Sequence, residues 1–360
     1  MARYIYKKLL YGMLVLLGVV TVIFLLFNVL PGDPARMMLG QRADITSVEA
    51  INRDLGRDKP LGLQYINFLN DLSPISFHNK ADVRNYWYLD TYKYGKTIQL
   101  AGWGKEDILV LKEPYLRRSY QSKRKVSEIL IEAFPATMLL ATVSMLFATV
   151  IGIGLGIICA VRKDSWFDRL ALLFAAIGMS LPSFFAAILF AWLFAFVLAD
   201  YTGLSMFGSL YSVDDFGRGE YLNLRNLILP AITLGIRPLA IIVQLTRSSL
   251  LDVLSQDYIR TAKAKGLSSF RIITHHAMKN ALNPVITAIS GWFASLMAGA
   301  VFIEYVFDWK GVGVVIVDAL EKYDLPVIMG AVLFISIILI IINIFVDLLY
   351  GIIDPRVRMT

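Results

Sequence analysis

Few residues in this chain of 360 could carry out covalent or metal chemistry. There are three histidines, His78, His275 and His276, and one cysteine, Cys159. A single cysteine excludes a disulfide framework, a zinc cluster and an iron–sulfur site. His275 and His276 are adjacent, so in a helix they point to different faces. We therefore expect that the chain binds no metal and that Cys159, inside an apolar run, is a packing residue.

The usual signatures of an enzyme are also missing from the sequence. An intramembrane protease needs a serine with a histidine base, or two aspartates within the membrane. The three histidines lie outside the apolar segments, and Asp347 has no second aspartate at membrane depth. The chain contains no Gly-x-x-x-x-Gly-Lys-Ser/Thr phosphate loop, so it does not hydrolyse ATP by that route. We predict that it has no catalytic residues and no cofactor of its own.

One charge inside an apolar segment needs a separate explanation. Arg237 lies about ten residues into a long apolar run and is followed by Pro238. A charge near the middle of a bilayer is expensive and usually faces a bundle interior or an aqueous cavity. We expect Arg237 to face a translocation cavity. The alternative is that Arg237 binds backbone carbonyls that Pro238 leaves without their usual partner.

The elements that position these residues are those of a membrane protein. The composition is 57% hydrophobic and 18% charged, against about a quarter charged in an ordinary soluble domain. This excludes a soluble enzyme with one core and excludes disorder. A helix that crosses a bilayer needs roughly 20 apolar residues, and six segments meet this condition: 9–30, 135–160, 170–198, 227–246, 284–307 and 326–352.

The distribution of Lys and Arg predicts how these segments are oriented. Fourteen lie in the N-terminus, the 161–169 and 247–283 loops and the C-terminal tail, whereas four lie in loops 199–226 and 308–325. Basic residues favour the cytoplasmic side, so both termini are predicted to be cytoplasmic and 1–30 to be an uncleaved signal anchor. The long 31–134 segment is extracytoplasmic, because long loops translocate regardless of charge. The net charge of +7 therefore indicates orientation and docking, and no nucleic-acid partner is expected.

Two of the predicted helices carry small residues at every fourth position. The set in the second is Ser144, Ala148, Gly152, Gly156 and Ala160, and the set in the fifth is Thr287, Gly291, Ser295 and Gly299. Small residues on one face let helices approach closely within lipid. We expect a compact helical bundle.

The cytoplasmic loop 247–283 is predicted to fold as two helices joined by a tight turn. Leu251, Leu254, Tyr258 and Ala262 share one face of the first helix, and Gly266 is placed to end it with Leu267 as its hydrophobic partner. Ser268 or Ser269 can cap a second helix that runs to Asn283, after which Pro284 begins the next span. A basic segment that touches anionic lipid is the alternative. A glycine-punctuated two-helix shape favours docking on another protein.

Here the sequence resembles the permeases of oligopeptide/dipeptide-type ABC importers. The similarity lies in short motifs in the same order along the chain: 31–34 (Pro-Gly-Asp-Pro), 180–184 around Pro182, 229–235 around Pro230, 257–284 in the cytoplasmic loop, 307–313 around Gly311, and 350–358 around Asp354. The resemblance implies an all-α membrane protein with the type I ABC importer permease fold and six transmembrane helices. The resemblance also implies a location in the inner membrane of a prokaryote.

The resemblance also implies partners and roles. The chain would form half of a peptide channel with a homologous second permease, two cytoplasmic ATPase subunits that use ATP and Mg, and an extracytoplasmic binding protein. The ATPase-coupling residues would be Tyr258, Arg260, Thr261, Ala262, Lys263, Lys265, Gly266 and Leu267. Ser180 and Pro182, with Arg237, are expected at the translocation cavity.

The sequence departs from the family pattern in three places, the first being Arg260-Thr261-Ala262, where the general loop motif has Glu-Ala-Ala. Lys310 stands where a proline usually precedes Gly311. About 40 residues, 73–113, are inserted in the first outer segment. The predicted divisions of the chain are the anchor 1–30, the extracytoplasmic segment 31–134, which contains this insertion, and the core 135–354. The inserted residues are rich in aromatics, which are depleted in disorder, so we expect a small folded addition that contacts the binding protein.

Other functions are open at this point. An ion-coupled secondary carrier would show internal repeats and midplane carboxylates, and neither is apparent. A passive membrane subunit predicts that changing Gly266 to a bulky residue leaves transport intact. Within the resembling family, nickel chelates and glutathione are alternatives to peptides.

Overall fold

The computed structural model describes residues 2–29, 59–82, 85, 87–104, 106–213 and 219–353. The motif 31–34, the side chain of Asp347 and the closing residues from Asp354 lie outside the described residues. The described part forms two compact units. One is built mainly from Ala133–Val314 and the chain after Ile338, and the other from Lys7–Glu132 with Val315–Ile337.

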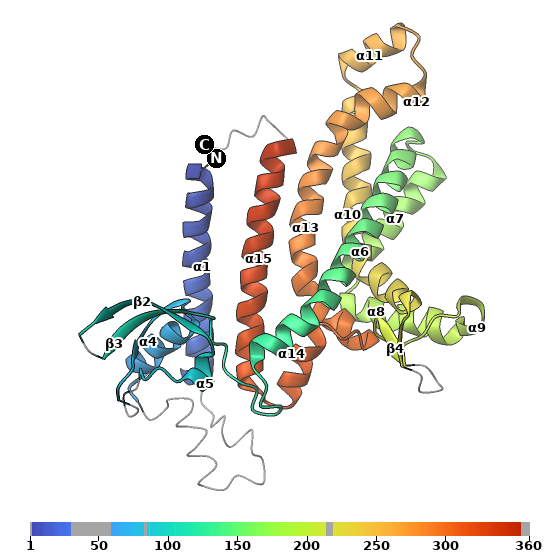
Figure 1. Cartoon of the computed structure of the whole chain (residues 1–360). Coiled ribbons are helices and arrows are strands. Elements are labelled where there is room, and N and C mark those ends of the chain that lie inside the picture. The colour runs from blue at the N-terminus through green and yellow to red at the C-terminus, as the bar shows by residue number, and fades with distance from the viewer. Residues whose placement is uncertain are drawn as a thin grey trace. The chain divides into compact units, whose positions relative to one another are not determined.

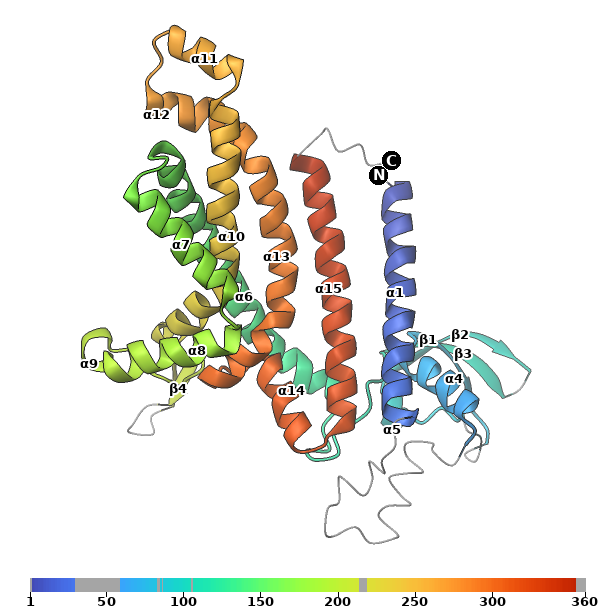
Figure 2. The ribbon, with the colours of Figure 1, turned by 180° about the vertical axis from the view of Figure 1, so that it is seen from behind.

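The first unit is a bundle of long helices (Figures 1 and 2). Its elements are α6 (Val126–Val161), α7 (Trp166–Ser180), α8 (Ser183–Trp192), the π-helical η2 (Leu193–Val197), α9 (Ala199–Thr202), the hairpin β4 (Tyr211–Val213) and β5 (Glu220–Leu222), the 3-10 helix η3 (Leu224–Leu227), α10 (Ile228–Leu254), α11 (Asp257–Ala264), α12 (Ser269–Arg271), the π-helical η4 (Ile272–Ala277), α13 (Met278–Phe307), α14 (Val312–Glu321) and α15 (Leu325–Ile353). The first seven residues of α6, and α14 and α15 in part, extend into the second unit.

The second unit combines a long helix with a small α/β segment. Its elements are α1 (Ala2–Val29), α4 (Leu61–Leu72), β1 (Ile75–Asn79), α5 (Thr91–Tyr94), β2 (Thr97–Trp103) and β3 (Asp107–Lys112). The strands form an antiparallel sheet in the order β1-β3-β2. The chain is thus mostly helical as predicted, but it is not all-α, because the residues predicted as a folded insertion form this sheet.

The core of the small segment is polar as well as apolar. His78, Lys112 and Tyr94 are buried, and Tyr94 and Lys93 both donate to the carboxylate of Asp71. Burial lowers the pKa of His78 to about 4 and that of Lys112 to about 8. His78 is therefore neutral at pH 7 and acts as a core residue.

Within the described residues, four helices are long and apolar enough to cross a membrane, and two further bent helix pairs bring the number to as many as six. The predicted span 170–198 is not one continuous helix: α7 and α8 meet at an angle of 113°. Leu181 has extended backbone angles and Pro182 caps α8, because a proline disfavours the helical conformation of the residue before it. The fifth predicted span, within α13, is bent by 53° between Met297 and Ala300.

Prolines at other predicted helix starts have a different outcome. Pro135 and Pro284 were expected to begin spans, but each lies inside a longer helix, α6 and α13 respectively. The helices therefore begin before the apolar stretches do.

Glycines of α6 bring its backbone against α10. A Cβ added at Gly156 would lie 2.5 Å from Cβ of Thr246 and 2.9 Å from the backbone oxygen of Val243, and one at Gly152 would lie 2.8 Å from Ile242. The predicted small-residue face of the second span is therefore a helix contact. The matching set in α13 is different: Thr287, Gly291 and Ser295 are exposed within this chain.

We expect Gly156→Ala to lower the stability of the bundle by about 1–3 kcal/mol, the typical range for overpacking. The backbone oxygen of Val243 cannot move away without displacing α10. The matched control is Gly154→Ala on the same helix, where an added Cβ meets nothing within 4 Å. Thermal unfolding of the two purified variants in detergent measures the difference. Equal midpoint temperatures for both variants would contradict the close approach.

Candidate functional site

The loop between α10 and α13 forms a two-helix elbow, defined here as residues 255–277. α11 ends at Ala264, and Gly266 has a φ of +79°, in the left-handed region that favours glycine. The Gly266 N–H donates to the oxygen of Lys263, and the Leu267 N–H donates to that of Ala262. These two bonds form a Schellman motif. Ser268 then accepts from the N–H of Arg271 as the cap of α12. The predicted turn is confirmed in detail.

The second arm of the elbow continues directly into the bundle. α12, η4 and α13 follow one another directly from Ser269 to Met297, where α13 bends, so the predicted boundary at Pro284 is wrong. The second helix of the elbow is therefore continuous with the first part of α13.

One face of the elbow is buried against the ends of α6 and α10. Ile259 and Ile272 are buried in a cluster with Leu250, Ala262 and Ala277. The buried face of α11 is thus Ile259 with Ala262, whereas Tyr258, predicted on this face, is 42% exposed. The Tyr258 hydroxyl accepts a hydrogen bond of 2.9 Å from Asn280 on α13. This hydrogen bond links α11 to the start of α13.

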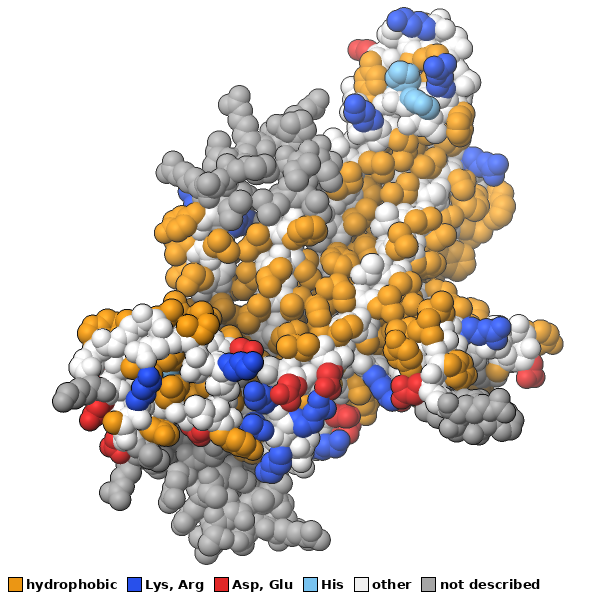
Figure 3. All heavy atoms as spheres, viewed as in Figure 1, with side chains coloured by type: hydrophobic (Ala, Val, Ile, Leu, Met, Phe, Trp, Pro, Cys, Tyr) orange, Lys and Arg blue, Asp and Glu red, His pale blue; other side chains and the backbone are white. Residues whose placement is uncertain are grey.

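The other face of the elbow is exposed and basic. Arg260, Thr261, Lys263, Lys265 and Gly266 are exposed, Leu267 is half-buried and Ala262 is buried. Sequence reasoning did not identify Phe270, which is 77% exposed next to these charges. The elbow projects beyond the end of α7 in the first unit (Figure 1), and Lys and Arg side chains surround the histidines on it (Figure 3). Such a basic tip with an aromatic side chain suits a groove on another protein.

A buried ion pair holds the helices at the base of the elbow. Arg247 on α10 donates to both carboxylate oxygens of Asp168 on α7, at 2.6 and 2.7 Å. The Asp168 side chain is 2% exposed and also accepts from the backbone N–H of Asp164. This pair could not be identified from the sequence, because Arg247 stands there only among the basic loop residues and nothing local joins positions 79 residues apart.

Arg237 lines a small pocket of about 70 Å³, mostly apolar, between α7, α8, α10 and α13. Ser183, Thr233, Trp292 and Ser295 contribute to its lining. The Arg237 guanidinium is 3.5 Å from the backbone oxygen of Met179 at the end of α7. Arg237 therefore contacts a carbonyl at the helix break rather than one that Pro238 leaves free.

The two other predicted cavity residues lie at the same break. The Ser180 hydroxyl donates to the oxygen of Ala176 in its own helix, and Pro182 is exposed at the start of α8. The pocket is lined by their neighbours Leu181 and Ser183. The break thus brings the predicted residues close to Arg237, but Ser180 and Pro182 are not part of the pocket lining.

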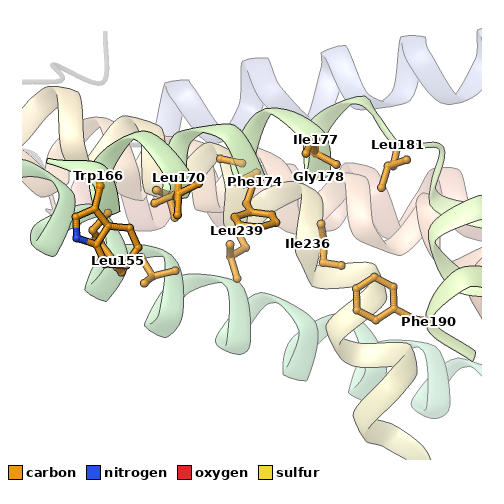
Figure 4. A pocket seen from close by; sticks show the side chains of 15 residues that line it. Leu155, Trp166, Leu170, Phe174, Ile177, Gly178, Leu181, Phe190, Ile236 and Leu239 are labelled. Atoms are coloured by element: carbon orange, nitrogen blue, oxygen red, sulfur yellow. The ribbon is translucent and has the colours of Figure 1, made fainter. Parts of the chain in front are cut away.

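A larger cavity of about 550 Å³ lies between α7 and α10. Its lining is almost wholly apolar: Phe174, Ile177 and Leu181 face Ile236 and Leu239 across it (Figure 4). It offers little to orient a polar solute, so the candidate cavity for one is the small pocket at Arg237.

The predicted outer turn, 307–313, is closed by buried polar contacts. Asp308 has a left-handed backbone, and the Trp309 indole N–H donates to the oxygen of Ala136 at 2.9 Å. The Gly313 N–H donates to the carboxylate of buried Glu304 at 2.6 Å. Lys310, which departs from the family pattern, is exposed, so a proline is not needed for this turn. Glu304 is engaged here and not with Arg237.

Comparisons with known proteins agree with this architecture. Residues 152–359 match the family described as binding-protein-dependent transport system inner membrane component, and residues 1–76 match the N-terminal part of such membrane components. The chain is similar to two dipeptide transport system permease proteins. It is 34% identical to that of Alkalihalophilus pseudofirmus over 99% of this chain and 100% of the relative. It is 33% identical to that of Escherichia coli K12 over 99% of both.

Two further similarities extend this result. The chain is 34% identical to a glutathione transport system permease protein of Pectobacterium atrosepticum over 99% of both chains. A solved structure of the MetNI methionine ABC transporter in an inward-facing conformation covers 63% of this chain and 97% of its own, with a TM-score of 0.51 and 15% identity. That structure supports the fold alone.

Proposed function

The chain belongs to the family of binding-protein-dependent transport system inner membrane components, and from this premise we propose that it forms half of the translocation pathway of an ATP-driven peptide importer. The observation that carries the proposal is the exposed basic elbow, which continues as one helix into α13. Two relatives that align with this chain over almost their whole length are dipeptide permeases. A glutathione permease among the relatives makes that tripeptide the second candidate substrate.

The proposed topology has six transmembrane helices with both termini in the cytoplasm. Each bent pair, α7 with α8 and the two parts of α13, then counts as one crossing. The elbow and the basic loops 161–169 and 247–283 lie on the cytoplasmic side. Residues 31–134 lie on the extracytoplasmic side, where the binding protein delivers the substrate.

The proposed partners follow from two features: the sequence has no phosphate-binding loop for ATP, and the elbow has an exposed basic face. A homologous permease completes the channel, and two ATPase subunits bind ATP and Mg. In the proposed complex, Tyr258, Arg260, Thr261, Lys263, Lys265 and Gly266 contact the ATPase groove. Ala262 and Leu267 do not contact the ATPase in this proposal. They support the contacting residues, because they pack the elbow onto α6 and α10.

The mechanism that we propose is alternating access. Closure of the ATPase subunits moves the elbow, and the continuous helix from α12 to α13 rotates the bundle against the partner permease. The pocket at Arg237 then changes the side to which it is open. Mutations in the elbow uncouple hydrolysis from transport rather than abolish binding.

The test is uptake into proteoliposomes that contain the whole complex and receive the binding protein. A labelled dipeptide should accumulate with enclosed ATP and without an ion gradient, and unlabelled dipeptide should compete better than glutathione. Uptake that follows an ion gradient without ATP would establish a secondary carrier. Stronger competition by glutathione would reassign the substrate.

We expect Arg237→Gln to lower the kcat/KM of peptide uptake roughly tenfold or more, because a hydrogen bond to a charged group contributes about 1.5–3 kcal/mol. Arg237→Lys keeps the charge and should retain more activity. Initial rates of uptake over a range of peptide concentrations measure the effect. Unchanged uptake with normal assembly in Arg237→Gln would remove Arg237 from the cavity proposal.

A further inference from the structure

Among the residues that the structure describes, nothing covers one face of the sheet in the second unit, and that face is apolar. Ile75, Leu111 and Ile98 form one row across its three strands, and Phe77 and Leu109 pair in the next. Ile75, Phe77 and Ile98 are 52%, 55% and 64% exposed. An antiparallel sheet with one face in water normally carries polar residues on that face. This pattern indicates that something apolar covers it.

The apolar residues of this face are not part of the core of the segment, which lies on the other side of the sheet. The inward side chains of β1 and β3, which include His78, Ile108 and Val110, are buried. On that side the ring of Tyr94 lies 4.7 Å from that of His78. The segment therefore has a complete core without the outward residues, which form a separate surface.

The position of the segment beside α1 defines where this surface points. α4 packs on α1 through a hydrogen bond of 2.6 Å between Tyr65 and Thr21 and through Phe68 against Phe24. Thr21 and Phe24 lie inside the apolar window of α1, Tyr6–Phe27. The segment is thus attached to a part of α1 that is apolar enough to lie in the membrane.

The uncovered face is oriented toward the N-terminal direction of α1. In Figures 1 and 2 the sheet lies beside the C-terminal half of α1, with α4 and α5 on one side and the N-terminal direction of α1 on the other. Figure 3 shows hydrophobic side chains along the edge of this segment that faces the N-terminal direction of α1. Because α1 crosses the bilayer in the proposed topology, that direction leads into lipid.

The residues on this face are those that the membrane interface favours. Trp103 is 58% exposed, and its ring lies 6.1 Å from that of Phe77. Tryptophan is enriched where hydrocarbon meets the headgroups, because its ring is apolar and its N–H is polar. An aromatic pair with aliphatic neighbours suits the boundary between acyl chains and headgroups.

We propose that the sheet rests on the bilayer through this face, which comprises Ile75, Phe77, Ile98, Trp103, Leu109 and Leu111. The surface is continuous with that of α1, and its occupant is the lipid of the leaflet from which the C-terminal end of α1 emerges. The bilayer then fixes the tilt of the sheet, and its opposite side remains in water. The proposal does not depend on the transported substrate.

The test compares two consecutive residues of β2 with opposite side-chain directions. Cys159 is the chain's one cysteine, so Cys159→Ala provides a cysteine-free background. Ile98→Cys and Gln99→Cys are then spin-labelled separately in the whole complex in lipid nanodiscs; Gln99 is exposed and faces the other side of the sheet. We expect the label at position 98 to collide several-fold more with oxygen than with a water-soluble nickel chelate. The label at position 99 should show the reverse preference.

Other outcomes would overturn the proposal. Equal access of the nickel chelate to both labels would place the face in water. Protection of position 98 only after the binding protein is added would identify a protein contact instead. If labelling disturbs assembly, quenching of the native Trp103 by lipids with brominated acyl chains is the second measurement. It is obtained as the difference between the parent complex and Trp103→Phe, and the absence of a difference would also overturn the proposal.

Discussion

Gly266→Val should abolish ATP-driven uptake while the complex still assembles. Gly266 has a φ of +79°, and a left-handed conformation costs roughly 1–2 kcal/mol for an ordinary L-residue and is a genuine outlier for a β-branched one. The turn will therefore re-form with another backbone geometry, and α11 will shift against α12. The basic face of the elbow then no longer fits its partner, and hydrolysis continues without transport. Parallel assays of uptake and ATP hydrolysis in proteoliposomes measure this separation.

Gly266→Asn is the matched control, because asparagine adopts the left-handed conformation more readily. Space is not the limiting factor, since a Cβ added at Gly266 meets nothing within 4 Å. The asparagine variant should thus keep most of the uptake that the valine variant loses. Normal uptake by Gly266→Val would favour a passive membrane subunit, and equal loss in both variants would argue against the backbone explanation.

The elbow could be predicted from sequence because its determinants are local. Gly266 and Ser268 act through hydrogen bonds to residues within five positions of them. The helix-ending and helix-starting signals therefore lie in adjacent residues. The face of α11 that is buried was less predictable, because it depends on Leu250 and Ile272 of other helices.

Prolines show where local signals are insufficient. Pro182 ends α7, but Pro135, Pro238 and Pro284 lie inside helices. Membrane helices tolerate proline when neighbouring groups satisfy the released carbonyls, so the outcome depends on tertiary contacts. At the break near Pro182 the oxygen of Met179 lies 3.5 Å from Arg237 of another helix. The sheet of residues 75–112 was likewise not predicted, although its aromatic content indicated a folded segment.

Loss of the buried pair between Asp168 and Arg247 is expected to be the most destabilising single change. Asp168→Leu leaves the guanidinium of Arg247 with no carboxylate at 2.6 Å, and breaking a buried pair by removing one partner costs about 3–5 kcal/mol. α7 and α10 then lose their link at the base of the elbow. Thermal unfolding of the purified complex should show a large decrease in midpoint temperature, and uptake should fall with it.

A double-mutant cycle separates the contribution of the ion pair to stability from the separate effects of each substitution. Asp168→Leu combined with Arg247→Met removes both charges, and the double variant should be more stable than Asp168→Leu alone, because no uncompensated buried charge remains. The exposed pair Lys322–Asp318, 3.8 Å apart, is the control: Asp318→Asn should change stability by about 1 kcal/mol or less. If the recovered stability is not accompanied by recovered uptake, the pair is needed for the movement of the elbow as well as for the fold. Additive losses in the cycle would show instead that the two residues do not act as a pair.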